Sequence, residues 1–172
     1  RQFTINNDKI YIADTYNHST IRLSLTGKCI AKESTLYNYP HAIAAHSAFV
    51  YVGYTSWSGH GRYISAVHRH KLNASNTIDT GNSNGLRYAW GMSLNSAGNR
   101  LIIADYVRNQ LYEYSISNYQ NHWNPVSLSL QQRSNSSYSS SNGYFRRPTD
   151  AAYDSSGNIY ALDLYGHRIQ KF

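Results

Sequence analysis

The chain repeats one short pattern, and no other feature constrains its fold as strongly. The pattern is clearest in residues 148–172. There an apolar segment, a Ser-Ser-Gly-Asn turn and a second apolar segment ending at Asp163 precede a polar loop and an alternating segment. Two apolar segments joined by a Gly-Asn turn indicate a β-hairpin, and the alternation is typical of a half-buried strand. We therefore expect three consecutive strands in this region.

Three further copies lie upstream. Residues 10–14 and 101–105 are apolar segments that end in aspartate and lead into a loop and another strand-like segment. A more divergent copy begins at Pro40; it has Gly53 in place of the aspartate and a longer loop over 54–62. The copies divide the chain into predicted units of approximately 1–34, 35–80, 81–128 and 129–172.

The composition agrees with many short strands and loops. The 172 residues include 17 tyrosines, and only 15% of the residues are charged. Tyrosine favours strands, whereas serine and asparagine favour turns. The formal net charge of +7 fits either an acidic partner such as nucleic acid or acidic glycans, or a solubilising excess of basic residues. The second interpretation is favoured, because Lys and Arg are spread along the chain.

Two loops carry a recognisable signature. Asp14-Thr-Tyr-Asn-His18 and Gly166-His-Arg-Ile-Gln-Lys-Phe172 resemble the NHL repeat, whose signature is Asp, two residues, then Asn-His-(Arg/Leu)-Ile. Residues 148–154 resemble the Pro-x-Gly-Val-Ala-Val-Asp opening of the same family. The chain departs from the signature at Gly166, which replaces the asparagine, and at Asn109, which replaces the histidine.

This resemblance implies an all-β β-propeller in which each copy is a four-stranded blade around a channel. NHL propellers usually have six blades, sometimes five, and four copies are visible here. The last copy has no segment for an outer strand, which would expose unpaired backbone groups. Two explanations for the missing strand stay open: it belongs to further residues of a longer chain, or a protein partner or second protomer supplies it by strand addition. Arg1 itself looks like the first residue of a processed or truncated product.

Blade geometry predicts one face on which a ligand would bind. The loops after the second strands and the starts of the first strands should share that face. Aromatic rings beside Arg or Asn stack on sugars, nucleobases or the loops of a partner, although large rings also fill the wedge between blades. The candidates for this ligand-binding face are Tyr54, Trp57, His60, Arg62, His41 and Trp90.

The aspartates that end the second strands have two possible roles. They could hold a cation in an acidic ring, or each could accept backbone N–H groups within its own loop. Because the same residue recurs in several copies, the loop-building role is favoured. The predicted loop-building motif comprises Asp14, Asn17, His18, Asp105, Asp163 and His167.

Histidines raise the question of zinc, because the amidating-lyase branch of the NHL family has channel-facing histidines around zinc. His68 and His70 would share one face of a strand, whereas His41 and His46 would point to opposite faces. Zinc needs three or four converging ligands, and no such set is visible. We predict no metal site, no cofactor and no catalytic residues.

Location is indicated by weaker signals. Asn17, Asn73 and Asn135 begin N-glycosylation sequons. The single Cys29 cannot form an intrachain disulfide, and its strand-like surroundings predict a buried thiol. No apolar run approaches membrane-spanning length. The leading hypothesis is a non-enzymatic, extracellular module for binding, adhesion or assembly, with the sequons as its candidate N-glycosylation sites. The alternatives are an RNA-binding propeller with a basic face and a metal-dependent, lyase-like enzyme.

Overall fold

The computed structural model describes residues 2–34, 39–46, 49–58, 62–71, 78–81, 86–116, 123–126, 141 and 143–172. Side chains are described for all of these except 55–58, 62–71, 78–81 and 123–126. The described residues form strands and two single turns of 3₁₀ helix, with no α-helix. The prediction of an all-β chain is confirmed.

The strands form four antiparallel sheets, which we call blades 1 to 4. Blade 1 contains β1 (Phe3–Asn6), β2 (Lys9–Asp14), β3 (Ser19–Ser24) and β4 (Cys29–Ser34). Blade 2 contains β5 (Pro40–His46), β6 (Phe49–Ser58), β7 (Arg62–Lys71) and β8 (Ile78–Gly81). Blade 3 contains β9 (Ala89–Leu94), β10 (Arg100–Asp105), β11 (Gln110–Ile116) and β12 (Trp123–Val126). Blade 4 contains β13 (Pro148–Tyr153), β14 (Ile159–Asp163) and β15 (Arg168–Lys171).

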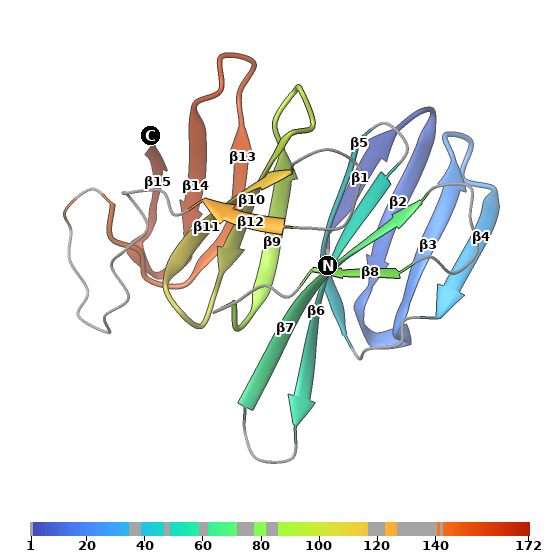
Figure 1. Ribbon diagram of the computed structural model, residues 1–172, viewed down its shortest axis with the longest axis horizontal. Helices are drawn as coiled ribbons and strands as arrows, with labels where there is room; N and C mark the ends of the chain where they lie inside the picture. Colours follow the sequence, from blue (N-terminus) through green and yellow to red (C-terminus); the bar gives the residue numbers. More distant parts are fainter. Residues whose placement is uncertain are drawn as a thin grey trace.

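Every blade is a meander, in which each strand pairs with the next one along the chain. The blades stand side by side in chain order, with blade 1 in blue at one end and blade 4 in red at the other (Figure 1). Their first strands lie innermost, since β5 contacts both β1 and β9, and β9 contacts β13. Among the described residues blade 4 has three strands, as the sequence predicts.

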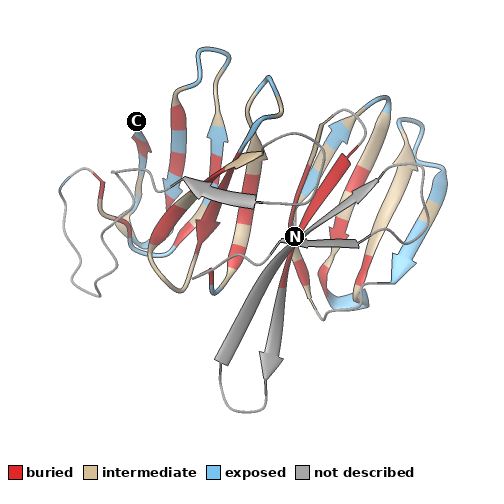
Figure 2. Cartoon of the chain, viewed as in Figure 1, coloured by how far each residue is buried: buried red, intermediate tan, exposed pale blue. Residues whose placement is uncertain are grey.

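The core consists of three apolar layers, one between each pair of neighbouring blades. Strand β10 shows why the layers form: Leu101 and Ile103 face blade 2, while Ile102 and Ala104 face blade 4, and all four are fully buried. Alternate side chains of a strand point to opposite faces, so a strand between two neighbours is apolar throughout. Figure 2 shows buried and exposed residues alternating along β14 of blade 4, whereas β4 at the outer edge of blade 1 is mostly exposed.

The hairpin turns are built by side chains that accept backbone hydrogen bonds. In the turn between β13 and β14, Asp154 Oδ1 accepts from the N–H groups of Ser156 at 2.9 Å and Asn158 at 2.8 Å. Gly157 takes a left-handed φ of +86°, which glycine adopts without steric cost. The predicted hairpin is confirmed by the antiparallel pairing of β13 with β14.

One local expectation is wrong. Cys29 is exposed, because β4 is the outermost strand of blade 1 and most of its side chains face solvent. In the part of the chain that the structure describes, no helix has the length and apolar character needed to cross a membrane.

Candidate functional site

The aspartate that ends the second strand of blade 3 links two backbone segments at one end of the blade by hydrogen bonds. Asp105 is fully buried and accepts four backbone hydrogen bonds. Two come from the segment leading into β9, from Arg87 N–H at 2.6 Å and Tyr88 N–H at 3.2 Å. Two come from the loop after β10, from Val107 N–H at 3.1 Å and Arg108 N–H at 3.0 Å. Burial raises the pKa of Asp105, and these four hydrogen bonds oppose that rise.

Blade 4 uses its aspartate in the same way. Asp163 is fully buried and accepts from Arg146 N–H at 2.6 Å and from Arg168 Nε at 3.2 Å. In blade 1, Asp14 accepts from Asn17 Nδ2 at 2.8 Å. Each carboxylate thus bonds within its own blade, and no group of three His, Cys, Asp or Glu residues suited to a metal occurs among the described residues.

The residue four positions after each aspartate has an unusual backbone. His18, Asn109 and His167 have φ angles of 49°, 58° and 51°, in the left-handed region that non-glycine residues seldom occupy. Two of these side chains reach the next blade. His18 Nδ1 accepts from Tyr39 N–H at 3.3 Å, and Asn109 Oδ1 accepts from Arg147 N–H at 2.7 Å. We call these two contacts the interblade joints.

The two residues that donate in the interblade joints share the same backbone conformation and the same place in the chain. Tyr39 and Arg147 also have positive φ angles, 62° and 56°, and each directly precedes the proline that opens β5 or β13. Both joints therefore fix the point at which the next blade begins. In the first joint, Thr15 Oγ1 adds a buried hydrogen bond to the carbonyl oxygen of Pro40 at 2.7 Å.

Aromatic rings form a continuous row across the same end of blades 2 to 4. His41 stacks on Trp90 with ring centroids 5.5 Å apart, and Trp90 stacks on Tyr106 at 4.6 Å. The guanidinium of Arg147 lies 5.0 Å from the ring centroids of both Tyr106 and Tyr165. We call this row, together with Tyr88, the aromatic–arginine ribbon.

The ribbon carries a positive charge at one end and is uncharged at the other. Arg147 Nη1 donates to Tyr106 Oη at 2.9 Å, and this hydrogen bond raises the pKa of the exposed Arg147. At the other end, the Tyr88 hydroxyl and His41 Nε2 are hydrogen-bonded at 2.9 Å. Burial lowers the pKa of His41 to about 4, so that imidazole is neutral at pH 7. The ribbon thus joins flat apolar rings to a fixed positive charge.

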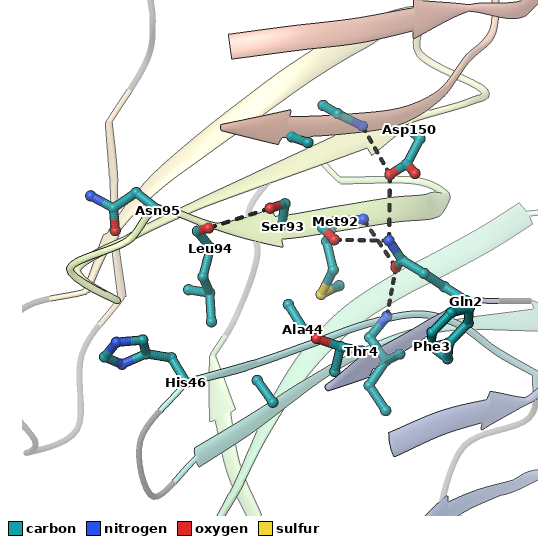
Figure 3. Close-up of a pocket in the computed structure, with 14 residues that line it drawn as sticks. Gln2, Phe3, Thr4, Ala44, His46, Met92, Ser93, Leu94, Asn95 and Asp150 are labelled. Carbon is teal, nitrogen blue, oxygen red and sulfur yellow. Dashed lines mark hydrogen bonds between the residues drawn. The ribbon is translucent and has the colours of Figure 1, made fainter. Parts of the chain in front are cut away.

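A cavity lies where the first strands of all four blades converge (Figure 3). This cavity of ≈ 260 Å³ is lined mainly by β1, β5, β9 and β13. Gln2 crosses it: its Nε2 donates to Met92 O at 2.9 Å and to Asp150 Oδ1 at 3.4 Å, and its Oε1 accepts from Ile43 N–H at 2.9 Å. One side chain of blade 1 therefore bonds to blades 2, 3 and 4.

The family description "NHL repeat" matches residues 145–172. Blade 4 is an NHL repeat. The resemblance seen in the sequence is confirmed there. A comparison with curated proteins gives no match.

Solved structures share the fold of the whole described chain. A chain of a nidogen–laminin complex superposes with a TM-score of 0.70 at 14% identity, covering 96% of this chain and 56% of that one. The hydrazine synthase of Kuenenia stuttgartiensis gives 0.62 at 12%, covering 98% and 47%. The complex of KlAtg21 with the coiled coil of AgAtg16 gives 0.63 at 8%, covering 95% and 49%.

These neighbours are β-propellers, which confirms the predicted fold class. The chain spans about half the length of the matched structures.

The structure separates the predicted ligand-binding residues. His41 and Trp90 lie together in the ribbon. Tyr54 is 3% exposed and packs between blades 1 and 2, apart from the ribbon. His60 lies outside the described residues, as do the side chains of Trp57 and Arg62.

Only one of the three sequons lies in the part of the chain that the structure describes. Asn17 is exposed in the loop of blade 1, and Asn73 and Asn135 lie outside the described residues. Sequence reasoning missed Tyr106, Tyr165 and Arg147. A signal exists for the two tyrosines, because each follows the repeated aspartate of an NHL-like loop by one or two positions.

Proposed function

We propose that this chain is a non-enzymatic β-propeller module that binds protein partners through the aromatic–arginine ribbon. The observation that carries the proposal is the row His41–Trp90–Tyr106–Arg147–Tyr165, in which stacked rings end in a fixed guanidinium. Tyr, Trp and Arg are the residues that most often dominate binding energy at protein interfaces. Two neighbours of the same fold are complexes of proteins by their descriptions.

The positive charge around the ribbon favours a partner with acidic side chains. Arg87, Arg146 and Arg147 are exposed at this end, while the nearby Asp105 and Asp163 are buried and hydrogen-bonded. An arginine whose guanidinium stacks on tyrosine keeps free N–H groups for a carboxylate. The partner surface therefore combines acidic side chains with an apolar or aromatic group.

A displayed library of random 16-residue peptides tests this proposal. We expect peptides selected on the wild-type chain to be acidic and to contain aromatic residues. Arg147→Ala should weaken their binding by about tenfold or more. Lys28→Ala is the matched control, because it removes one exposed positive charge from the turn between β3 and β4 of blade 1, a blade that contributes no residue to the ribbon. Equal losses in both variants, or no selectable peptide, would contradict the proposal.

RNA is the second candidate, because bases stack on tyrosine and arginine planes in the manner that the ribbon offers. The test is fluorescence anisotropy with a 20-nucleotide poly(U) probe. If RNA is the ligand, binding falls steeply between 50 and 200 mM salt and Arg147→Ala lowers the salt slope by about one. No binding at the lower salt concentration removes this candidate.

We further propose that the module acts outside the cell as an adhesion or assembly unit, with a glycan on Asn17. Exposure of Asn17 and the likeness to a chain of the nidogen–laminin complex support this. A glycosylated Nδ2 keeps one N–H for Asp14. The intact mass of the secreted protein, before and after peptide N-glycosidase, should show a glycan that Asn17→Gln removes.

Strand addition along β15 is the proposed route for assembly. Among the described residues β15 pairs with β14 alone, and a strand at the edge of a sheet can accept an added strand through its backbone N–H and C=O groups. Hydrogen exchange measures this directly: partner binding should slow the exchange of β15 amides. Unchanged exchange in the bound state would exclude this route.

A further inference from the structure

The peptide unit that joins Arg146 to Arg147 is held on both sides. Its carbonyl oxygen accepts a hydrogen bond from Tyr165 N–H at 3.0 Å, in the loop after β14 of the same blade. Its N–H group donates to Asn109 Oδ1 at 2.7 Å, in the loop of blade 3. Because a peptide unit is planar, these two hydrogen bonds fix its orientation, and the φ angle of Arg147 then sets the direction in which that side chain leaves the backbone.

The backbone of Arg147 has a conformation that arginine seldom adopts. Its φ of 56° is left-handed, which brings Cβ too close to the following carbonyl oxygen. Arg147 also precedes Pro148, and the proline ring restricts the backbone of the residue before it. The hydrogen bond to Asn109 therefore stabilises Arg147 in a conformation that it would otherwise leave.

The same loop of blade 3 also contacts the Arg147 side chain. Tyr106 Oη accepts from Arg147 Nη1 at 2.9 Å, and the Tyr106 ring centroid lies 5.0 Å from the guanidinium carbon. The loop is itself fixed by Asp105, which accepts two backbone hydrogen bonds from within it. Residues 105–109 thus hold the backbone of Arg147 through Asn109 and its guanidinium through Tyr106.

We infer that Asn109 is a positioning residue for partner binding, which holds the guanidinium of Arg147 in place on the aromatic–arginine ribbon before a carboxylate of the partner binds. This inference rests on the function proposed above for the ribbon. A long side chain that is already ordered loses less conformational entropy on binding than a mobile one. Asn109 is not a member of the ribbon, so its effect on affinity passes through Arg147.

The joint between blades 1 and 2 provides a comparison within the same chain. There His18 takes the place of Asn109 and Tyr39 that of Arg147, with the same pair of left-handed backbones. The residue held in that joint is an uncharged ring, which lies edge-on to His18 with centroids 4.7 Å apart. Loss of the first joint should therefore lower stability without a specific effect on carboxylate binding.

Isothermal titration calorimetry tests the inference with two peptides: an acidic peptide selected on the wild-type chain, and the same peptide with each Asp and Glu replaced by Asn and Gln. Asn109→Gly should weaken binding of the acidic peptide by about three- to tenfold, because the guanidinium must then be ordered on binding. It should leave binding of the amide peptide unchanged. Asn109→His restores an acceptor of the kind that His18 provides, and it should recover part of the lost affinity.

Two controls separate positioning from a structural effect. His18→Gly should leave the ratio of the two affinities unchanged. In an Arg147→Ala chain, Asn109→Gly should cause no further loss, since the side chain that it positions is absent. A further loss there, or equal weakening of both peptides by Asn109→Gly, would overturn the inference. Near-ultraviolet circular dichroism checks that each variant is folded.

NMR relaxation of the Arg147 Nε–Hε group in the free chain tests the positioning without any partner. The group should be ordered in the wild type and mobile in Asn109→Gly. Equal order in both chains would overturn the inference, even where Arg147→Ala abolishes peptide binding and so supports the proposed function. An Arg147 side chain that Asn109 orders, in a chain that selects no peptide, would contradict the proposed function and leave the positioning role of Asn109 standing.

Discussion

The side-chain oxygen of Asn109, in the loop of blade 3, accepts a hydrogen bond of 2.7 Å from the backbone N–H of Arg147, which leads into blade 4. Both residues hold left-handed backbone conformations. His18 and Tyr39 repeat the arrangement between blades 1 and 2. The asparagine-for-histidine departure at Asn109 therefore preserves an acceptor at the same place.

Replacing Asn109 tests this joint. Asn109→Ala should lower the free energy of unfolding by about 1–3 kcal/mol, because it removes the hydrogen bond and strains the left-handed backbone. Asn109→Gly relieves the strain and should lose about 1 kcal/mol. Asn109→His should lose less than Asn109→Ala, since His18 serves the first joint. Urea unfolding measures all three, and equal losses for His and Ala would show that the acceptor is unimportant.

Asp105→Asn should destabilise the fold by about 2–4 kcal/mol. The substitution keeps the shape but sets an amide NH₂ against backbone donors that now bond to a buried carboxylate. Asp14→Asn is the control, because Asp14 is only half-buried and should lose less than 1 kcal/mol. The comparison is made by thermal and urea unfolding at pH 7.

Acid should destabilise the chain through His41. Its pKa falls to about 4 in the folded state because the ring is buried, whereas it is about 6.5 when unfolded. The unfolded state binds more protons between these values, so stability is lost as the pH falls from 6.5 to 4. The ring is partly exposed, and we expect a loss of about 1–2 kcal/mol.

The matched variant for this pH effect is His41→Asn, which removes the titrating group. The difference in unfolding free energy between wild type and variant should shrink as the pH falls. A difference that stays constant from pH 7 to pH 4.5 would contradict a shifted His41.

Gly91→Ala should lower stability by about 1–3 kcal/mol. A methyl group at this position would collide with the carboxylate of Asp150 and the backbone of Thr149, so β9 and β13 would have to separate. Gly157→Ala is the contrasting variant. Its methyl group meets nothing within 4 Å, and only its left-handed φ of +86° is strained. A larger loss of stability for Gly157→Ala would be inconsistent with close packing at Gly91.

Local features of the fold could be predicted from the sequence. The turn at Asp154 and Gly157 and the hairpin around it depend on residues next to one another in the chain. Because the pattern repeats, the same prediction of strands and turns extends to the other blades. The exposure of Cys29 could not be predicted in this way, because an apolar neighbour such as Ile30 suggests burial, whereas the position of β4 at the edge of its sheet leaves the thiol exposed.

The candidate site could be predicted only in part. His41 and Trp90 were expected on one face, but their stacking depends on the register between blades 2 and 3. Tyr106 and Arg147 are 41 positions apart and meet only because blade 4 docks beside blade 3. A single sequence contains no signal for that contact.

Gln2 bears on how the molecule folds. Arrays of like repeats that touch only their neighbours tend to unfold one unit at a time. Gln2 instead bonds to residues 41, 90 and 148 positions further along the chain. Forming these contacts closes long loops, which costs conformational entropy, so we expect them to form late in folding. Detaching any one inner strand breaks bonds at the axis that the others share, so the four blades should melt as one cooperative unit.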